Sequence, residues 1–160
     1  METAEVIEFV AVGLALVACV VSDLRRRVIP NCCVAFVMVS RVAYLVASCA
    51  GGGSWAPSIL GAAEALVVLS VAAAFSRASF GASGVGGGDV KLISVLGLCF
   101  GAEWTPVLLM LTSAFVVATG LFCRGRRGTG EPGGSAVPAA PAITIAAFVT
   151  FALAFRVKQL

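Results

Sequence analysis

Two aspartates, Asp23 and Asp89, are the residues of this sequence whose type and setting could support hydrolytic chemistry. Histidine is absent from the 160 residues, and neither a serine-containing elbow nor a thiol motif offers another nucleophile. Two carboxylates held close together cannot both ionise readily, so they share a proton. One can then activate a water against a peptide carbonyl while its protonated partner polarises that carbonyl. The other acidic residues are expected at the outer face, in a loop or within a span: Glu2, Glu5, Glu8, Glu64, Glu103 and Glu131.

Asp23 directly follows an apolar run and precedes a basic cluster, Arg25 to Arg27. Pro30 biases Ile29 towards an extended conformation and so ends this segment. Asn31 is a good N-cap for a following helix. Taken alone, this segment is also compatible with an aspartate that merely pairs with the arginines at a helix end.

Asp89 lies in a glycine-rich segment, GVGGGDVKL, at positions 84–92. Glycines there permit positive φ angles and close backbone approach. A phosphate-binding loop is excluded, because the GxGxxG pattern would need glycine at position 89 and no GK[ST] follows. Taken alone, the segment is also compatible with a flexible linker whose aspartate caps a helix.

The composition is that of a membrane protein. The chain is 60% hydrophobic and 12% charged, and its mean hydropathy of +1.06 is far above that of a soluble domain. A spanning helix needs roughly 20 apolar residues. We therefore predict an all-α fold, a polytopic bundle of six transmembrane helices that forms a single domain over residues 1–160. The apolar runs lie at 6–22, 32–49, 58–75, 92–102, 104–122 and 139–155.

The distribution of charge along the chain predicts its topology. Six spans place both termini at one face and three connecting segments, 24–31, 77–91 and 124–138, at the other. These segments hold eight of the eleven basic residues, so the positive-inside rule predicts that this face is cytoplasmic and that both termini lie outside. Asp23 and Asp89, 66 positions apart (89 − 23), then share the cytoplasmic edge, and this joint placement favours a catalytic pair.

The fourth apolar run is too short to cross a bilayer. Its 11 residues, 92–102, span only about 17 Å as a helix, against a hydrocarbon core of about 30 Å. Either the helix begins well before Lys91, or the glycine-rich segment dips below the membrane surface. Irregular backbone at that depth is tolerated where it is buried in protein or lines a watery cavity. The short run therefore predicts a cavity around Asp89.

We expect neither a metal nor a cofactor. The six cysteines lie in or beside apolar runs and show no CxxC spacing, so a zinc or redox site is not expected. The formal charge of +3 is interpreted as a topology signal and does not indicate a nucleic-acid partner. Acidic residues precede the first apolar run where a secretory signal would carry Lys or Arg, so this run is expected to be a retained helix.

The sequence resembles the type IV prepilin peptidases, most closely their small TadV/CpaA-like members, with the archaeal preflagellin peptidases as relatives. Asp23 with Ile29-Pro30-Asn31 carries one part of the resemblance, and residues 86–92, GGGDVKL, match the GxGDxKL motif of the family. The six-span plan extends the resemblance over essentially the whole chain. Val137-Pro138 and Pro141-Ala142, before the last apolar run, also belong to it.

The resemblance implies a peptidase that removes the basic leader from prepilin or pseudopilin precursors at the cytoplasmic face of a bacterial or archaeal membrane. Cleavage in this family usually follows a glycine just ahead of the apolar helix of the precursor. Asp23 and Asp89 carry over as the catalytic pair. The large bifunctional members also methylate the new N-terminus and carry paired CxxC motifs, which are absent here, so N-methylation is not expected. The residues expected on the substrate side are Lys91, Gly86, Gly88, Pro30 and Asn31.

Gly86 and Gly88 are expected to shape the loop that presents Asp89. Two interpretations of Lys91 remain open. Its side chain positions the site or the substrate, or it snorkels to the membrane surface and marks the topology. Helix dipoles, each worth about 0.3 to 1 kcal/mol, predict that Asp23 is protonated and Asp89 ionised. The arginines that follow Asp23 act in the opposite sense.

Other functions fit parts of this pattern. An ion-coupled transporter or channel could use Asp23 and Asp89 as a cation site, because broken, glycine-rich helices with acidic residues suit ion binding. A presenilin-like intramembrane protease also uses a GxGD aspartate, but such proteins are larger. A structural assembly protein of a secretion apparatus is the third alternative.

Arg41 and Glu64 fall within spans, where ionisable groups are usually paired. We expect these two residues to form an ion pair.

Overall fold

The computed structural model describes residues 3–26, 29–80, 86–126 and 139–158. Within these ranges the chain forms five helices and no strand, and each helix is long and apolar enough to cross a membrane. The helices are α1 (Thr3–Arg26), α2 (Asn31–Ala50), α3 (Ala56–Phe80), α4 (Gly87–Arg126) and α5 (Ala140–Lys158). The predicted all-α membrane architecture is confirmed.

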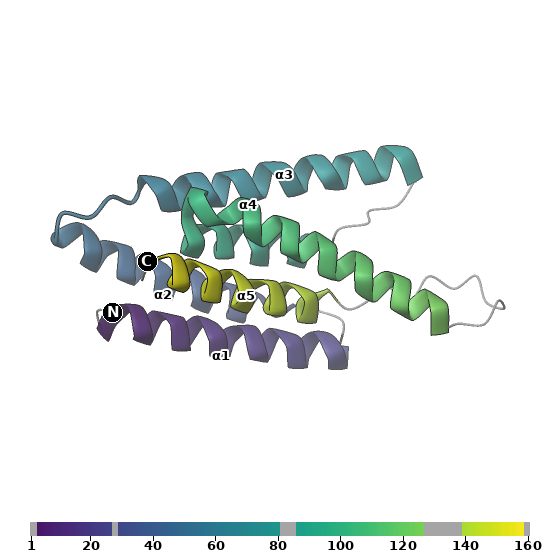
Figure 1. The fold of residues 1–160 in the computed structure, drawn as a ribbon, viewed down its shortest axis with the longest axis horizontal. Coiled ribbons are helices and arrows are strands. Elements are labelled where there is room, and N and C mark those ends of the chain that lie inside the picture. Colours follow the sequence, from purple (N-terminus) through teal and green to yellow (C-terminus); the bar gives the residue numbers. More distant parts are fainter. Residues whose placement is uncertain (1–2, 27–28, 81–85, 127–138, 159–160) are drawn as a thin grey trace.

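Helix α4 contains both the fourth and the fifth predicted spans, which is why the structure has five helices where the sequence predicted six. Its backbone leaves the helical conformation at Gly101, with φ 72° and ψ 174°, a combination that is open essentially to glycine alone. In Figure 1 the ribbon of α4 folds back on itself. We call residues 87–100 the first arm and residues 102–126 the second arm.

The first arm is short because Gly101 ends it. Its helix begins at Gly87, four residues before Lys91 (91 − 87). Of the two alternatives that the sequence left open, this agrees with an early start of the helix. Fourteen residues, 87–100, span only about 21 Å as a helix. This is shorter than a hydrocarbon core of about 30 Å, so the break at Gly101 lies within the bundle and not at its end. A cavity of about 310 Å³ reaches the break and is lined there by Phe100, Gly101 and Ala102. Irregular backbone that borders a cavity is the arrangement tolerated within a membrane.

Close packing of small residues holds the break against α3. A Cβ atom added to Gly61 would lie 2.5 Å from the carbonyl oxygen of Gly97, and one added to Gly97 would lie 2.6 Å from that of Gly61. The backbones of α3 and α4 therefore touch directly, as small residues allow at helix interfaces in membranes. Thr105 Oγ1 donates a 2.7 Å hydrogen bond to the carbonyl of Gly101 and so satisfies one acceptor at the break.

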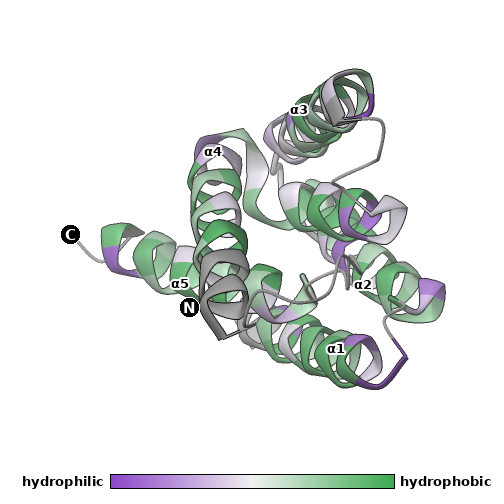
Figure 2. Ribbon diagram, turned by 90° about the vertical axis from the view of Figure 1, so that its right-hand side faces the viewer, coloured by the Kyte–Doolittle hydropathy of each residue, from purple (hydrophilic) through white to green (hydrophobic). Residues whose placement is uncertain are grey.

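The first arm forms the centre of the bundle. Leu92 and Leu96 are fully buried there against Leu16 of α1 and Ile143 of α5. Large apolar side chains are instead exposed along the outer faces, and Figure 2 shows the ribbons coloured mostly as hydrophobic. Soluble proteins rarely expose contiguous apolar surface on this scale. The chain is a multi-pass membrane protein.

Both marked chain ends lie at the same end of the bundle in Figure 1. The end of α1, the start of α2 and the start of the first arm lie at the opposite end. Asp23 is in the last turn of α1 and Asp89 in the first turn of α4. The fold therefore carries both aspartates to one end of the molecule, as the sequence predicted.

Candidate active site

Asp23 is fixed between the end of α1 and the start of α5. Its side chain is buried, with 7% exposure. Its Oδ2 atom accepts a hydrogen bond of 3.0 Å from the backbone N–H of Ala140, the first residue of α5. The first N–H groups of a helix lack partners within the helix, and the helix N-terminus favours a negative charge. Asp23 thus fulfils for α5 the role of a capping carboxylate supplied by another helix.

Asp89 is held by the turn that precedes its own helix. It is half-buried, and the backbone N–H of Gly86 donates a hydrogen bond to its carboxylate. A Cβ atom at position 86 would lie only 2.9 Å from Asp89 Oδ2. The carbonyl of Gly86 in turn accepts a 3.2 Å hydrogen bond from the N–H of Val90. A side chain at position 86 would therefore displace the Asp89 carboxylate from its place against the backbone.

The two predicted motif segments meet at Gly88. A Cβ atom added to this glycine would lie 3.3 Å from the Cβ atom of Ile29. The residue before Pro30 consequently packs against the first turn of α4. The structure brings together the segment after α1 and the glycine-rich turn, although about 60 positions separate them in the sequence (88 − 29 = 59).

The carboxylates of Asp23 and Asp89 interact electrostatically with each other. Both also lie at a helix N-terminus, Asp89 at that of α4 and Asp23 at that of α5. The helix-dipole argument that assigned the proton to Asp23 counted only α1 and α4. With α5 included, the N-terminus of α5 opposes the C-terminus of α1 at Asp23, so the dipole argument for a proton on Asp23 becomes weaker.

Pro30, not Asn31, is the N-cap of α2. Pro30 has extended angles of φ −66° and ψ 127°, and its carbonyl accepts the first hydrogen bond of the helix, 3.1 Å from the N–H of Cys33. Asn31 is already helical and exposed, and α2 has no side-chain cap. The predicted cap was wrong by one residue, because proline can occupy the half-helical position with its φ angle already set.

Lys91 is exposed on the first arm. This exposure is compatible with both interpretations of Lys91, contact with a substrate and snorkelling to the membrane surface. Val137 and Pro138, which also carry the resemblance, lie outside the described residues.

Arg41 pairs with Glu8 and not with Glu64, so that prediction was wrong. Its Nη1 lies 3.0 Å from both carboxylate oxygens of Glu8, and the two side chains are 13% and 12% exposed. Arg41 meets α3 at Ser58, whose hydroxyl accepts a 3.0 Å hydrogen bond from Nη2. The rotation of α2 about its axis directs the guanidinium towards α1 and the Gly101 break, a rotation that hydropathy alone does not reveal.

The Nε of Arg41 donates a 3.1 Å hydrogen bond to the carbonyl of Leu98. Leu98 belongs to the last turn of the first arm, whose carbonyls lose their helical partners at Gly101. A cation at a helix C-terminus is also favoured by the dipole. Arg41 therefore stabilises the deep end of the arm whose other end carries Asp89.

A bundle of membrane-spanning helices with two interacting carboxylates at one end defines an integral membrane protein with a candidate acid–base site. Residues 10–121 match the model of the type IV leader peptidase family, and the chain belongs to this family. The match includes Asp23 and Asp89, and it identifies the chain as a peptidase. The resemblance seen in the sequence is thereby confirmed. Comparisons with curated proteins and with solved structures gave no match.

Proposed function

We propose that the chain is a membrane aspartyl endopeptidase that removes the leader peptide from type IV prepilin or pseudopilin precursors. The observation that carries the proposal is the electrostatic interaction between Asp23 and Asp89, which come to the same end of the bundle from α1 and α4. Membership of the type IV leader peptidase family supports the same substrate class. The first N–H of α5 holds Asp23, and the backbone of Gly86 holds Asp89.

The proposed reaction needs one ionised and one protonated carboxyl group. The ionised group accepts a proton from water as the water oxygen attacks the scissile carbonyl carbon. The protonated group donates a hydrogen bond to the carbonyl oxygen, which becomes the oxyanion of a tetrahedral intermediate. Collapse of the intermediate breaks the C–N bond, and the proton passes to the leaving amine. The products are the leader with a new carboxylate and the mature chain with a new amino terminus.

Two hydrogen bonds prepare the carboxylates for this reaction. The N–H of Ala140 holds Asp23 and the N–H of Gly86 holds Asp89. Carboxylates fixed in this way lose little freedom when the substrate arrives, and such positioning lowers the barrier. The residues proposed to support the substrate around the pair are Gly86, Gly88, Pro30, Asn31 and Lys91.

The proposed site faces the cytoplasm. Arg25 and Arg26 are exposed at the same end of α1 as Asp23, and basic residues near span ends favour the cytoplasmic side. The termini are then outside. The sequence holds no paired CxxC motif, so the proposal is for peptidase activity without N-methylation.

A cleavage assay tests the proposal. Asp23→Asn and Asp89→Asn should each abolish processing of a co-expressed prepilin, while membrane insertion of the peptidase stays intact. Glu103→Gln is the matched control, because Glu103 is an exposed acid on the second arm, away from the pair. Processing retained in either aspartate variant would refute the paired-carboxylate mechanism.

An ion-coupled transporter with a cation site at Asp23 and Asp89 is the second candidate. Broken helices occur in transporters, and α4 is broken at Gly101, 12 residues (101 − 89) from Asp89. The same variants separate the two functions. A transporter would lose ion-dependent flux in these variants and would leave the precursor uncut in the wild type.

A further inference from the structure

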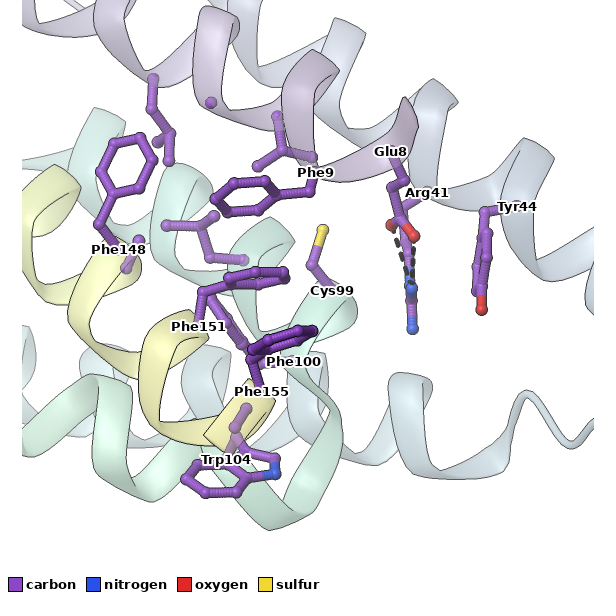
Figure 3. Close-up of a pocket in the computed structure, with 16 residues that line it drawn as sticks. Glu8, Phe9, Arg41, Tyr44, Cys99, Phe100, Trp104, Phe148, Phe151 and Phe155 are labelled. Carbon is purple, nitrogen blue, oxygen red and sulfur yellow. Dashed lines mark hydrogen bonds and ion pairs between the residues drawn. The ribbon is translucent and has the colours of Figure 1, made fainter. Parts of the chain in front are cut away.

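A cavity of about 250 Å³ lies between α1, α2, α4 and α5 (Figure 3). We call it the aromatic groove, because the rings of Phe9, Phe148, Phe151 and Phe155 surround it in the close-up. Phe9 and Phe151 stack with ring centroids 3.7 Å apart, which joins α1 to α5 along one wall. Arg41 and Glu8 border the groove and neutralise each other. The lining of the groove therefore suits an apolar ligand.

The groove is in register with the proposed active site on three helices. Its lining begins at Leu16 on α1, at Leu96 on α4 and at Ala147 on α5. These residues are each seven positions from a residue at the site: Asp23 (23 − 16), Asp89 (96 − 89) and Ala140 (147 − 140). Seven residues of helix correspond to two turns, or about 10 Å. The groove therefore starts about 10 Å from the carboxylates and continues into the membrane.

The far end of the groove is also at matching depth on two helices. On α1 the lining ends at Glu8 and on α5 at Phe155, each 15 positions from the site (23 − 8 and 155 − 140). Fifteen helical residues correspond to about 22 Å. The groove thus spans a band from about 10 to 22 Å beyond the carboxylates.

We infer that the aromatic groove binds the apolar segment of the precursor, the part that follows the bond to be cut. This inference rests on the proposed function and adds a subsite to it. A helix that leaves the carboxylates and enters the membrane would present its residues about 7 to 15 past the cleavage site to the groove. A lipid acyl chain is also apolar. The alignment of the groove with Asp23 and Asp89, however, favours a ligand that also reaches the two carboxylates.

Small residues line the groove where α1 and α5 pack closely together. Gly13 of α1 lines it, and a Cβ atom there would lie 3.5 Å from the Cζ atom of Phe148. Ala147 and Ala154 line the facing side on α5. Small residues on facing helices are the usual means of close helix packing in membranes.

Two leucine substitutions on α5 test the subsite. Ala154 lines the groove, whereas Ala152 on the same helix is exposed. Ala154→Leu should raise KM for the full precursor about tenfold with kcat nearly unchanged, because it removes binding that the substrate and the transition state share. A soluble peptide that contains the cleavage site but lacks the apolar segment should be cut as by the wild type. Ala152→Leu should leave both substrates unaffected.

Equal effects of Ala154→Leu on the precursor and the short peptide would overturn the inference, as would an effect no larger than that of Ala152→Leu. Crosslinking gives a readout that does not require cleavage. A photoreactive amino acid at position 151, in an Asp89→Asn background, should crosslink to precursor positions about 7 to 15 past the cleavage site. The same probe at Phe75, which is 69% exposed on α3, is the control.

Crosslinks from position 151 to lipid alone would overturn the subsite even if the wild type cleaves the precursor. Crosslinks to the precursor without cleavage by the wild type would instead refute the proposed peptidase function and retain the docking site. The two proposals therefore fail separately.

Discussion

The Oδ2 atom of Asp23 accepts a hydrogen bond from the backbone N–H of Ala140 across 117 positions of sequence. This contact joins the last turn of α1 to the first turn of α5 and aims a helix N-terminus at the carboxylate. Val137-Pro138 and Pro141-Ala142 flank Ala140 and carried part of the resemblance, but the sequence did not identify Ala140 as a partner of Asp23. The contact makes the start of α5 part of the proposed active site.

Ala140→Pro removes this donor with little cost to the helix, because proline is well tolerated at the first helical position. We expect kcat for precursor cleavage to fall at least about tenfold, the effect of losing one hydrogen bond to a charged group. Ala140→Gly keeps the N–H and should keep most of the activity. Thermal unfolding in detergent should show both variants folded. Equal activities of the two folded variants would contradict a role for the hydrogen bond.

Gly86→Ala should displace the Asp89 carboxylate, because the added Cβ would lie 2.9 Å from Oδ2. The carboxylate must then shift by roughly half an ångström, and because a displacement of about 1 Å costs roughly a hundredfold in rate, kcat should fall about tenfold while the protein remains folded. Gly87→Ala is a close control, since nothing lies within 4 Å of a Cβ at that position. Steady-state cleavage of one precursor by both variants makes the comparison. A fully active Gly86→Ala enzyme would exclude the proposed geometry of Asp89.

Arg41→Gln should lower stability by about 1 to 3 kcal/mol, between the values for exposed and buried ion pairs, because it removes the cation from the part-buried pair with Glu8. The double variant with Glu8→Gln should recover part of this loss, since no unpaired charge then remains. Glu64→Gln should have little effect, because Glu64 is not the partner of Arg41. Unfolding by denaturant in detergent micelles measures all of these variants. A larger loss for Glu64→Gln than for Arg41→Gln would contradict the observed pairing.

The rate of precursor cleavage should depend on pH with a bell shape, because Asp23 and Asp89 must together hold one proton. At low pH both groups are protonated and no base remains; at high pH both are ionised and no acid remains. Cleavage in proteoliposomes over a range of pH measures the profile. Infrared spectra assign the proton: the band of a protonated carboxyl should vanish in the variant that lacks its carrier. A rate independent of pH would contradict a shared proton.

The sequence by itself determined the all-helical membrane architecture and the family, and it indicated Asp23 and Asp89 as the proposed site. Hydropathy is a local property, so apolar runs identified the spanning segments, and basic residues at their ends placed Asp23 and Asp89 together. The GxGDxKL match at residues 86–92 and Asp23 with Ile29-Pro30-Asn31 indicated the family before the fold was known. These inferences needed only the order of residues along the chain.

Tertiary structure alone decided how the helices face one another. A helix that is apolar on all sides has no stripe that marks its inner face, so the sequence did not show that Arg41 turns towards Glu8. The fold-back at Gly101, the contact of Gly61 with Gly97 and the bond from Ala140 to Asp23 likewise depend on the depth and rotation of whole helices. Backbone packing between small residues sets that depth and rotation, and hydropathy does not predict this packing.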